Sequence, residues 1–203
     1  MAVEYKLPVI TVNKDGSLRG KGGLLEEEVI AFAKLLEEAG VDMIQVAQAN
    51  HTGNMGDTIP PMGDLPYNWT LPVAKHVKEV VKIPIVTVGR VISVEAGEQI
   101  LENGEADMIG YGRSLLADPD IAAKLERGEC IRECLNCNKG CVDAIQNRRY
   151  ISCVLNAENG DEATIFIKPA DTVKQIAIVG AGIAGLEAAR VAAKRGHNVT
   201  IFE

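Results

Sequence analysis

Four cysteines in the second half of the chain have the spacing of ligands to a metal centre. Cys134, Cys137, Cys141 and Cys153 form the pattern C-x2-C-x3-C-x11-C in a stretch with little helical or strand periodicity. Thiolates spaced this closely can wrap one compact centre, either an iron–sulfur cluster or a structural zinc ion. Three close ligands and one distant ligand favour the cluster, because zinc sites more often join two separated CxxC pairs. The fifth cysteine, Cys130, has no assigned role.

A glycine-rich motif, GAGIAG, stands between a predicted strand and a predicted helix near the C-terminus. In such a turn Gly180 permits the sharp bend, Gly182 lets the backbone approach a pyrophosphate, and Gly185 lets the helix pack closely on the strand. The pyrophosphate would lie at the helix N-terminus, where free N–H groups favour anions. Glu203 ends the next predicted strand and is the expected acceptor for an adenosine ribose hydroxyl, although a terminal carboxylate could equally be solvated.

Two Gly–Arg pairs, Gly89–Arg90 and Gly112–Arg113, follow predicted strands in the first half of the chain. Active sites of βα barrels lie at the carboxyl ends of the strands, and the loops after the last two strands commonly hold a phosphate. Glycine exposes backbone donors to the anion, and arginine adds a bidentate charge. A single pair would be explained by a surface turn, whereas two pairs at equivalent strand ends favour a phosphate site.

A third candidate is the loop 49–70, which has no helical or strand pattern and is long enough to suggest a function. His51 lies just beyond a strand end, where an imidazole could donate a proton near neutral pH. A hydrogen-bonded structural histidine is the competing interpretation. Trp69, in the same loop, could simply cover the core.

The elements that must position these residues alternate between strands and helices. Four short β-branched runs are predicted strands, at residues 8–12, 43–47, 83–88 and 107–111. Ser93 and Asp118 are expected N-caps of two of the intervening helices. Apolar strands flanked by helices predict a parallel sheet with both faces covered, made of four successive βα units.

Composition and charge narrow the classes of partner. The chain has 28 acidic and 21 basic side chains, a net charge of −7 and 47% apolar residues, which is typical of a globular protein. A negative chain without a basic stripe argues against a nucleic-acid partner. Because no apolar run approaches about 20 residues and Lys6 interrupts any signal-peptide core, we expect a cytoplasmic protein with no membrane partner. Thiols in that compartment stay reduced, which favours metal ligation over disulfides.

The motifs VTVGRV, YGRSLLADPD, CLNCNKGCVDA, ISCVLN and IVGAGIAGLEAARVAAKRGHNVTIFE, in this order, resemble the multidomain branch of the old yellow enzyme family. That branch includes 2,4-dienoyl-CoA reductase, 2-enoate reductase and trimethylamine dehydrogenase, and the cysteine spacing is closest to the dienoyl-CoA reductase form. The resemblance implies an α/β chain in three parts. These are the C-terminal half of an FMN-binding TIM (β/α)8 barrel at 1–127, a 4Fe-4S segment with a linker at 128–172, and the first βαβ unit of a Rossmann-like FAD- and NAD(P)-binding domain at 173–203.

The resemblance also implies an NAD(P)H-dependent flavin oxidoreductase that reduces the activated C=C bond of a small molecule, such as a 2-enoate or an enoyl-CoA. In that family, electrons pass from NAD(P)H to FAD, through the 4Fe-4S cluster to FMN, and then as hydride to the alkene. Arg90, Gly112 and Arg113 match positions that hold the FMN phosphate, and His51 matches a histidine that works with a tyrosine in proton donation. The remaining matches are the cluster ligands Cys134, Cys137, Cys141 and Cys153 and the FAD fingerprint Gly180, Gly182, Gly185 and Glu203.

Two features depart from the family pattern. The family strand that corresponds to 8–12 usually carries an arginine or lysine near the flavin ring, whereas Thr11 and Val12 occupy that region here. The chain also begins at what resembles the fifth barrel strand, so the other half of the barrel and most of the FAD region are expected to be absent from it. Because four of eight strands cannot close a barrel, we expect no turnover from the isolated chain.

Two other functions fit the same residues. One is a non-catalytic module whose cysteines hold zinc and whose half-barrel serves as a dimerisation surface, so a homo-oligomer is one expected partner. The other is oxidative N-demethylation by an amine dehydrogenase on the same scaffold, for which Tyr67 and Trp69 could form an aromatic bowl for a substituted ammonium. The cysteine spacing favours the alkene reductase over the amine dehydrogenase.

Overall fold

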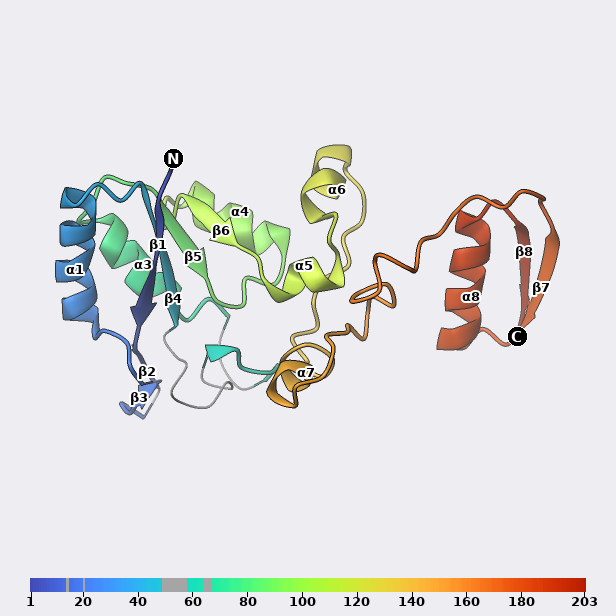
Figure 1. Ribbon diagram of the computed structural model, residues 1–203, viewed down its shortest axis with the longest axis horizontal. Helices are drawn as coiled ribbons and strands as arrows, with labels where there is room; N and C mark the ends of the chain where they lie inside the picture. Colours follow the sequence, from blue (N-terminus) through green and yellow to red (C-terminus); the bar gives the residue numbers. More distant parts are fainter. Residues whose placement is uncertain (14, 20, 49–57, 64–66) are drawn as a thin grey trace. The chain divides into compact units, whose positions relative to one another are not determined.

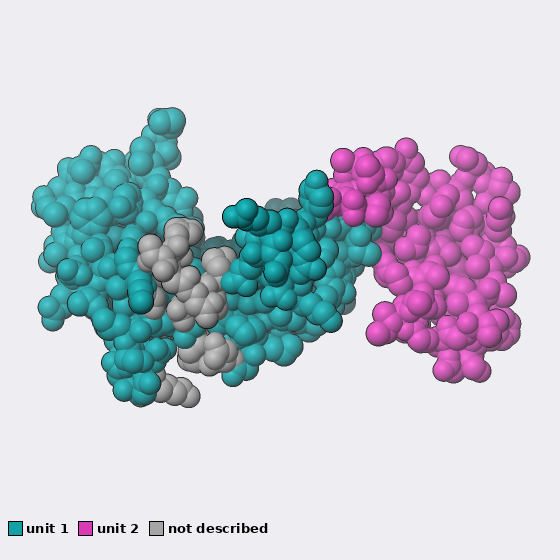
Figure 2. Space-filling view, turned by 60° about the horizontal axis from the view of Figure 1, so that its bottom comes forward, with its two compact units in different colours: residues 1–159 teal, residues 160–203 magenta. Residues whose placement is uncertain are grey.

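The computed structural model describes residues 1–13, 15–19, 21–48, 58–63 and 67–203. The chain divides into two compact units, unit 1 at Met1–Asn159 and unit 2 at Gly160–Glu203. Figure 1 traces the elements along the chain, and Figure 2 colours the two units separately.

Unit 1 is built on a four-stranded sheet in the order β1-β4-β5-β6 (Figure 1). The strands are β1 (Glu4–Val9), β4 (Met43–Gln48), β5 (Ile85–Val88) and β6 (Met108–Gly110). All three pairings are parallel. Because neighbours in the sheet follow the order of the chain without a reversal, the arrangement is that of successive strands of a βα barrel.

The predicted strand 8–12 overlaps the end of β1 and the short strand β2, but the strand of the main sheet begins earlier than predicted, at Glu4. Tyr5, Leu7 and Val9 alternate toward the hydrophobic core, which defines β1 as Glu4–Val9. Thr11–Val12 forms the short strand β2 instead, paired antiparallel with β3 (Leu18–Arg19). The continuous apolar run after Lys6 hides the period-2 alternation that would have located the strand. The other three predicted strands overlap β4, β5 and β6.

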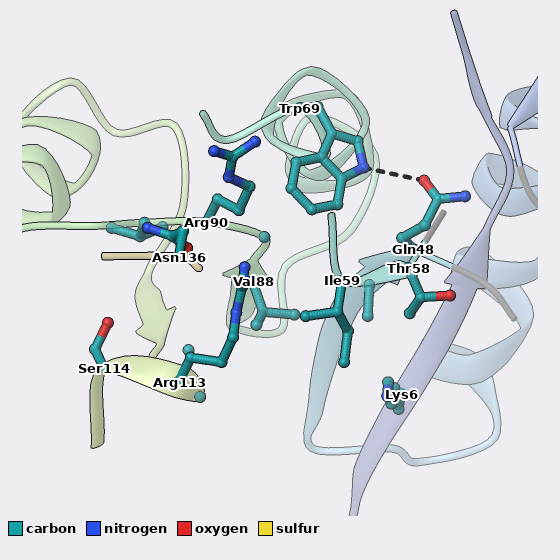
Figure 3. Close-up of a pocket in the computed structure, with 15 residues that line it drawn as sticks. Lys6, Gln48, Thr58, Ile59, Trp69, Val88, Arg90, Arg113, Ser114 and Asn136 are labelled. Carbon is teal, nitrogen blue, oxygen red and sulfur yellow. Dashed lines mark hydrogen bonds between the residues drawn. The ribbon is translucent and has the colours of Figure 1, made fainter. Parts of the chain in front are cut away.

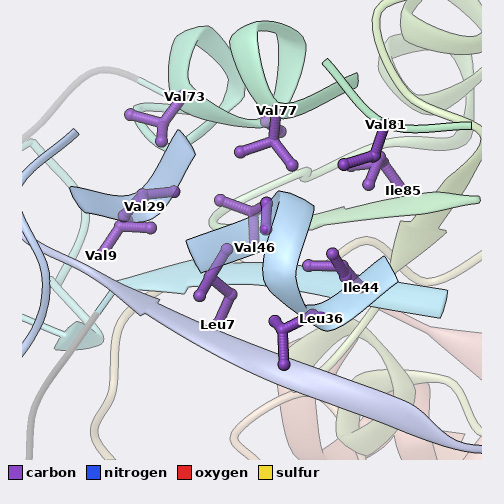
Figure 4. Close-up of a cluster of buried hydrophobic side chains, with 12 residues drawn as sticks. Leu7, Val9, Val29, Leu36, Ile44, Val46, Val73, Val77, Val81 and Ile85 are labelled. Atoms are coloured by element: carbon purple, nitrogen blue, oxygen red, sulfur yellow. The ribbon is translucent and has the colours of Figure 1, made fainter. Parts of the chain in front are cut away.

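The helices α1 (Glu26–Glu38), α3 (Leu71–Lys78) and α4 (Val94–Glu102) pack against one face of the sheet. Apolar side chains from β1, β4 and β5 meet those of α1 and α3 in the main core (Figure 4). Fully buried members of this core are Leu7, Val9, Val29, Ala33, Ile44, Val46, Ala74, Val77 and Ile85. We expected helices on both faces, but the opposite face of the strands carries residues such as Lys6 and Ala47 that line a cavity.

The two predicted helix caps have different outcomes. Ser93 caps α4, where its Oγ accepts a hydrogen bond from the backbone N–H of Ala96 at 3.1 Å. Asp118 is not a cap, because α6 (Ile121–Arg127) has Asp120 at its N-cap position. The Asp118 carboxylate accepts hydrogen bonds from Lys124 Nζ at 2.6 Å and from the backbone N–H of Arg132 at 2.9 Å. Its role is therefore to fix the chain that follows α6.

Residues 128–159, which we call the cysteine segment, have one short helix, α7 (Val142–Gln146). The segment is tied to α5 (Arg113–Ala117) and the residues around it by polar contacts. Asn156 Nδ2 donates to the carbonyl of Leu116 in α5 at 3.0 Å. Within the segment, the backbone N–H of Ser152 donates to the carbonyl of Gly140 at 2.8 Å. Side-chain and loop hydrogen bonds, more than regular secondary structure, give this segment its shape.

Unit 2 contains the predicted strand–helix–strand unit. β7 (Gln175–Val179) and β8 (Asn198–Phe202) form a parallel pair joined by α8 (Ile183–Lys194). Gly196 follows the end of α8 with a φ of 87°, a left-handed conformation in which glycine commonly ends helices. Within the described part of the chain, no helix is both long enough and apolar enough to span a membrane.

Candidate active site and cysteine cavity

A cavity of about 210 Å³ lies at the carboxyl ends of β4, β5 and β6 (Figure 3). We call it the strand-end cavity. Gly89, Arg90, Gly112 and Arg113 all line it, so the structure brings the two Gly–Arg pairs to one place. Two arginines and the backbone of two glycines at such a site can hold a phosphate group.

The backbone at the first Gly–Arg pair has an uncommon conformation. Gly89 has a φ of 153° and Arg90 a φ of 58°, which is rare for a residue with a side chain. A Cβ at Gly89 would lie 2.7 Å from Thr70 Oγ1, which is already hydrogen-bonded to the carbonyl of Val88. This turn therefore requires glycine at 89, and it directs the buried Arg90 to the cavity. Residues held in such conformations concentrate at functional sites.

The two arginines have different surroundings. The buried Arg90 guanidinium lies 4.8 Å from the centre of the Tyr67 ring, a cation–π distance. Arg113 is half-buried, and its Nη1 donates to the carbonyl of Pro60 at 3.1 Å and to the side-chain oxygen of Asn138. These two contacts hold the Arg113 guanidinium between the cavity and the cysteine segment.

Lys6 also lines the strand-end cavity, a position that the sequence pattern did not predict. In the parallel pairing of β1 with β4, Lys6 lies beside Gln45 and Pro8 beside Ala47. Lys6 is therefore the basic residue that this strand contributes to the cavity, and Thr11 and Val12 are not its equivalents. The signal that could have found it is the alternation of Tyr5, Leu7 and Val9 toward the core.

A hydrogen-bond network around Gln48, at the end of β4, fixes one wall of the cavity. Gln48 Oε1 accepts from Thr11 Oγ1 at 2.6 Å. It also accepts from Trp69 Nε1 at 3.1 Å (Figure 3). Gln48 Nε2 donates to the carbonyl of Arg19 at 2.8 Å, and the Arg19 guanidinium lies 5.9 Å from the Trp69 ring centre. The Trp69 ring is therefore held by the hydrogen bond from its Nε1 to Gln48 and lies near the Arg19 guanidinium.

The four predicted metal ligands line one smaller cavity, which we call the cysteine cavity: Cys134, Cys137, Cys141 and Cys153. The absence of a side chain at Gly140 lets the backbone before Cys153 approach the other cysteines, because a Cβ at this position would lie 2.5 Å from the carbonyl oxygen of Ser152. In the described ranges, no three His, Cys, Asp or Glu side chains are close enough together to hold a metal ion. The four cysteines thus share one cavity.

Two asparagines shape the loop between the first cysteines. Asn136 and Asn138 have φ values of 55° and 59°, and asparagine tolerates this left-handed region better than most residues. The backbone N–H of Asn136 donates to Cys134 Sγ at 3.3 Å. Burial raises the pKa of the Cys134 thiol, while this N–H and the Arg113 guanidinium act to lower it. Cys134 Sγ therefore receives one hydrogen bond from the backbone of its own loop and lies near the positive charge of Arg113, which comes from α5.

Arg113 lines both cavities. Burial lowers the pKa of its guanidinium from the ordinary value, and the charges of Cys134 and Cys141 act in the opposite direction.

Cys130 is exposed and does not line the cysteine cavity; it lines a different pocket, together with Glu129 and Arg132. His51 lies outside the described residues.

The glycine-rich turn of unit 2 shows a different reason for each glycine. Gly180 has a φ of 99°, and a Cβ at Gly185 would lie 2.0 Å from the carbonyl oxygen of Gly180. A Cβ at Gly182 would have no neighbour within 4 Å, so the space in front of it is open. The backbone N–H of Ala181 donates to the carboxylate of Glu203. Glu203 therefore reaches the turn from the end of β8.

The fold of unit 1 is that of the barrel domain of flavin-dependent oxidoreductases. The chain belongs to the NADH:flavin oxidoreductase / NADH oxidase family, whose model matches residues 19–130, and residues 178–203 match an NAD(P)-binding Rossmann-like domain. This confirms the resemblance to the old yellow enzyme family and its multidomain branch. It also confirms the fold class, part of a TIM barrel followed by the start of a Rossmann-like domain.

Individual relatives support the same assignment. A bilirubin reductase of Mediterraneibacter gnavus is 56% identical over all of this chain and 32% of its own length. A cinnamate reductase of Clostridium sporogenes is 38% identical over 90% of this chain and 29% of its own. The solved structure of a 2-naphthoyl-CoA reductase in complex with 2-naphthoyl-CoA is 29% identical, with a TM-score of 0.81 over 98% of this chain and 29% of that one. The chain thus spans about a third of the length of these proteins.

Proposed function

We propose that this chain holds the FMN phosphate, a 4Fe-4S cluster and the first part of an FAD site in an NAD(P)H-dependent reductase of activated C=C bonds. The observation that carries the proposal is the neighbourhood of the two cavities. A cavity with two arginines lies beside one lined by four cysteines, and Arg113 belongs to both. A flavin phosphate and a redox cluster are the groups that these residue sets suit.

The strand-end cavity fits the FMN phosphate by its chemistry. Arg90 and Arg113 would bind the phosphate oxygens, with backbone N–H groups near Gly89 and Gly112 as further donors. Lys6 would place a positive charge near the flavin ring, where it favours a ring that has gained negative charge. FMN, when bound, supplies the hydride, and His51 is the proposed proton donor to the other alkene carbon.

We infer that the cysteine cavity holds a cluster and not a single zinc ion, because three close cysteines and one distant cysteine are the spacing that favours a cluster. A neighbouring arginine and a backbone N–H are contacts of the kind that adjust cluster potentials. Cys134, Cys137, Cys141 and Cys153 are the proposed ligands.

The turn of unit 2 fits the pyrophosphate of FAD. The open space before Gly182 leaves room for an anion at the N-terminus of α8, and Glu203 already reaches the turn. With NAD(P)H as the electron source, electrons would pass from FAD through the cluster to FMN. The proposed sites lie in this order when the chain is followed from its C-terminus to its N-terminus.

An alkene is the favoured substrate class. Cinnamate, the substrate named for one relative, is a 2-enoate, and both bilirubin and naphthoyl-CoA are conjugated systems. The alternative, oxidation of a methylated amine, would use Tyr67 and Trp69 to bind the substituted ammonium. Both rings are already faced by this chain's own cations, Arg90 and Arg19, which leaves less room for a substrate cation.

A segment swap tests the proposal. The matched segment of the Mediterraneibacter gnavus bilirubin reductase would be replaced by this chain, because the two align over all of it at 56% identity. We expect the chimera to bind FMN, FAD and iron and to oxidise NADH or NADPH anaerobically with cinnamate, an enoyl-CoA or bilirubin as acceptor. The isolated 203-residue chain serves as the control and is expected to show no turnover.

Two outcomes would overturn the proposal. A chimera that carries all three cofactors but reduces none of these alkenes contradicts the substrate class, and oxidation of a methylated amine instead would support the amine dehydrogenase. A chimera that contains zinc in place of iron contradicts the cluster. Turnover by the isolated chain would show that half a barrel is sufficient.

A further inference from the structure

Among the described residues, Arg113 is the one side chain that lines both the strand-end cavity and the cysteine cavity. It follows β6 at the start of α5, while the cysteines come from the segment after α6. Arg90, the other arginine of the strand-end cavity, does not line the cysteine cavity. The two arginines therefore offer a comparison between a charge shared by the two cavities and a charge confined to one.

The Arg113 guanidinium has a fixed place between the cavities. Its Nη1 is hydrogen-bonded to the carbonyl of Pro60 and to the side chain of Asn138, a residue of the loop between Cys137 and Cys141. It is half-buried and interacts electrostatically with both Cys134 and Cys141. In such a partly desolvated place a unit charge acts more strongly on its neighbours than it would in water.

We propose that Arg113 couples binding of a phosphate in the strand-end cavity to the reduction potential of the centre held by the four cysteines. The inference rests on the proposed function and adds a link between its two sites. Reducing a 4Fe-4S cluster by one electron, from the 2+ to the 1+ state, adds one negative charge to the cysteine cavity. With no phosphate bound, the positive charge of Arg113 stabilises that negative charge, whereas a phosphate dianion bound to Arg113 offsets the positive charge and opposes the reduction.

The coupling must act in both directions. If phosphate lowers the potential of the centre, then reduction of the centre weakens phosphate binding by the same factor. For a coupling of about tenfold, which is within the usual range, the midpoint potential of a one-electron couple changes by about 59 mV. Arg113 then shares its charge between the two sites, and its effect can be measured without any substrate.

The test is a redox titration of the cluster-loaded 203-residue chain. Dithionite is the reductant, the reduced cluster is followed by electron paramagnetic resonance, and the buffer contains no phosphate. The titration is repeated with inorganic phosphate, with FMN, with riboflavin, which lacks the phosphate, and with sodium chloride at equal ionic strength. We expect phosphate and FMN each to lower the midpoint potential by about 59 mV, for tenfold coupling, and riboflavin and chloride to leave it unchanged.

Three variants locate the effect. Arg113→Gln should lower the midpoint potential in the absence of phosphate and remove the response to phosphate. Arg113→Lys keeps the charge and should restore most of the potential. Arg90→Gln is the matched control, since it should weaken phosphate binding while changing the phosphate-free potential less than Arg113→Gln does.

Equal midpoint potentials for wild type and Arg113→Gln, or equal shifts from the two arginine variants, would overturn the inference. If Arg113→Gln fails to fold, the wild-type titration decides alone, because a potential that no concentration of phosphate or FMN moves contradicts the coupling. A chain that takes up no iron contradicts the cluster of the proposed function. A loaded cluster with a phosphate-insensitive potential contradicts only the coupling.

Discussion

The parallel sheet and the cysteine segment of unit 1 are held together by different forces. Fully buried apolar side chains such as Leu7, Ile44 and Val77 join the strands to their helices. The cysteine segment has one helix of five residues and is tied down by polar contacts, among them those of Asp118 and Asn156. The sheet is therefore expected to fold without any cofactor, while the cysteine segment depends on close backbone approach and on what its cysteines bind.

The largest effect is expected from Gly140→Ala in the cysteine segment. The new Cβ would lie 2.5 Å from the carbonyl oxygen of Ser152, so the loop that carries Cys141 must move away from Cys153. We expect the variant to lose most of its iron and acid-labile sulfide after anaerobic purification. Gly182→Ala is the matched control, because its Cβ has no neighbour within 4 Å and its φ of −68° suits any residue. A Gly140→Ala chain with a full complement of iron would contradict this account of the segment.

The next effect is expected in the sheet. Leu7→Ala removes a fully buried side chain from the centre of the core and should lower the free energy of unfolding of unit 1 by about 2–5 kcal/mol. The loss should be the same in the metal-free and the metal-loaded chain, as measured by urea unfolding, because Leu7 touches neither cavity. Val12→Ala, at a side chain that is 64% exposed, should change stability by less than about 0.5 kcal/mol. A loss that appears only in the metal-loaded chain would remove the distinction between the two regions.

A smaller, pH-dependent effect is expected at Asp118. Burial would raise the pKa of this carboxyl, but hydrogen bonds from Lys124 and from the backbone N–H of Arg132 outweigh burial and lower the pKa from its ordinary value. Asp118→Asn should therefore cost about 1.5–3 kcal/mol at pH 7. Because the folded pKa is below the unfolded value of about 3.9, the stabilisation is present above that pH and is lost as the pH falls through the folded pKa.

Asp120→Asn is the control for this effect, because Asp120 is exposed and makes no capping hydrogen bond through its side chain. Chemical unfolding of both variants between pH 3 and pH 7 measures the difference. A constant difference between Asp118→Asn and wild type across that range would show that the Asp118 charge is not what holds the cysteine segment.

The same contrast explains what could be predicted from the sequence. Periodicity located β4, β5, β6 and the βαβ unit of unit 2, because burial of one face imposes a regular pattern on the residues. It misplaced β1, where Pro8 and Ile10 continue the apolar run on the face away from the core, and so it missed Lys6. Strand-end glycines and arginines were recognisable because barrel sites gather at that edge of the sheet.

The contacts of the cysteine segment could not be read from the sequence in the same way. The N-cap prediction for Asp118 used a local rule, but its carboxylate serves Arg132, fourteen residues away. The place of Arg113 between two cavities depends on Asn138 and Pro60, which are distant in the chain and have no periodic relation to it. Spacing identified the cysteines as a set, while the contacts that join this set to the strand-end cavity required three-dimensional coordinates.

Metal analysis of the anaerobically purified 203-residue chain tests the central claim most directly. We expect a brown protein with about four iron atoms and four acid-labile sulfides per chain, lost together when Cys137 is replaced by serine. A colourless protein that holds one zinc ion per chain would contradict it, because a zinc ion cannot relay electrons between flavins.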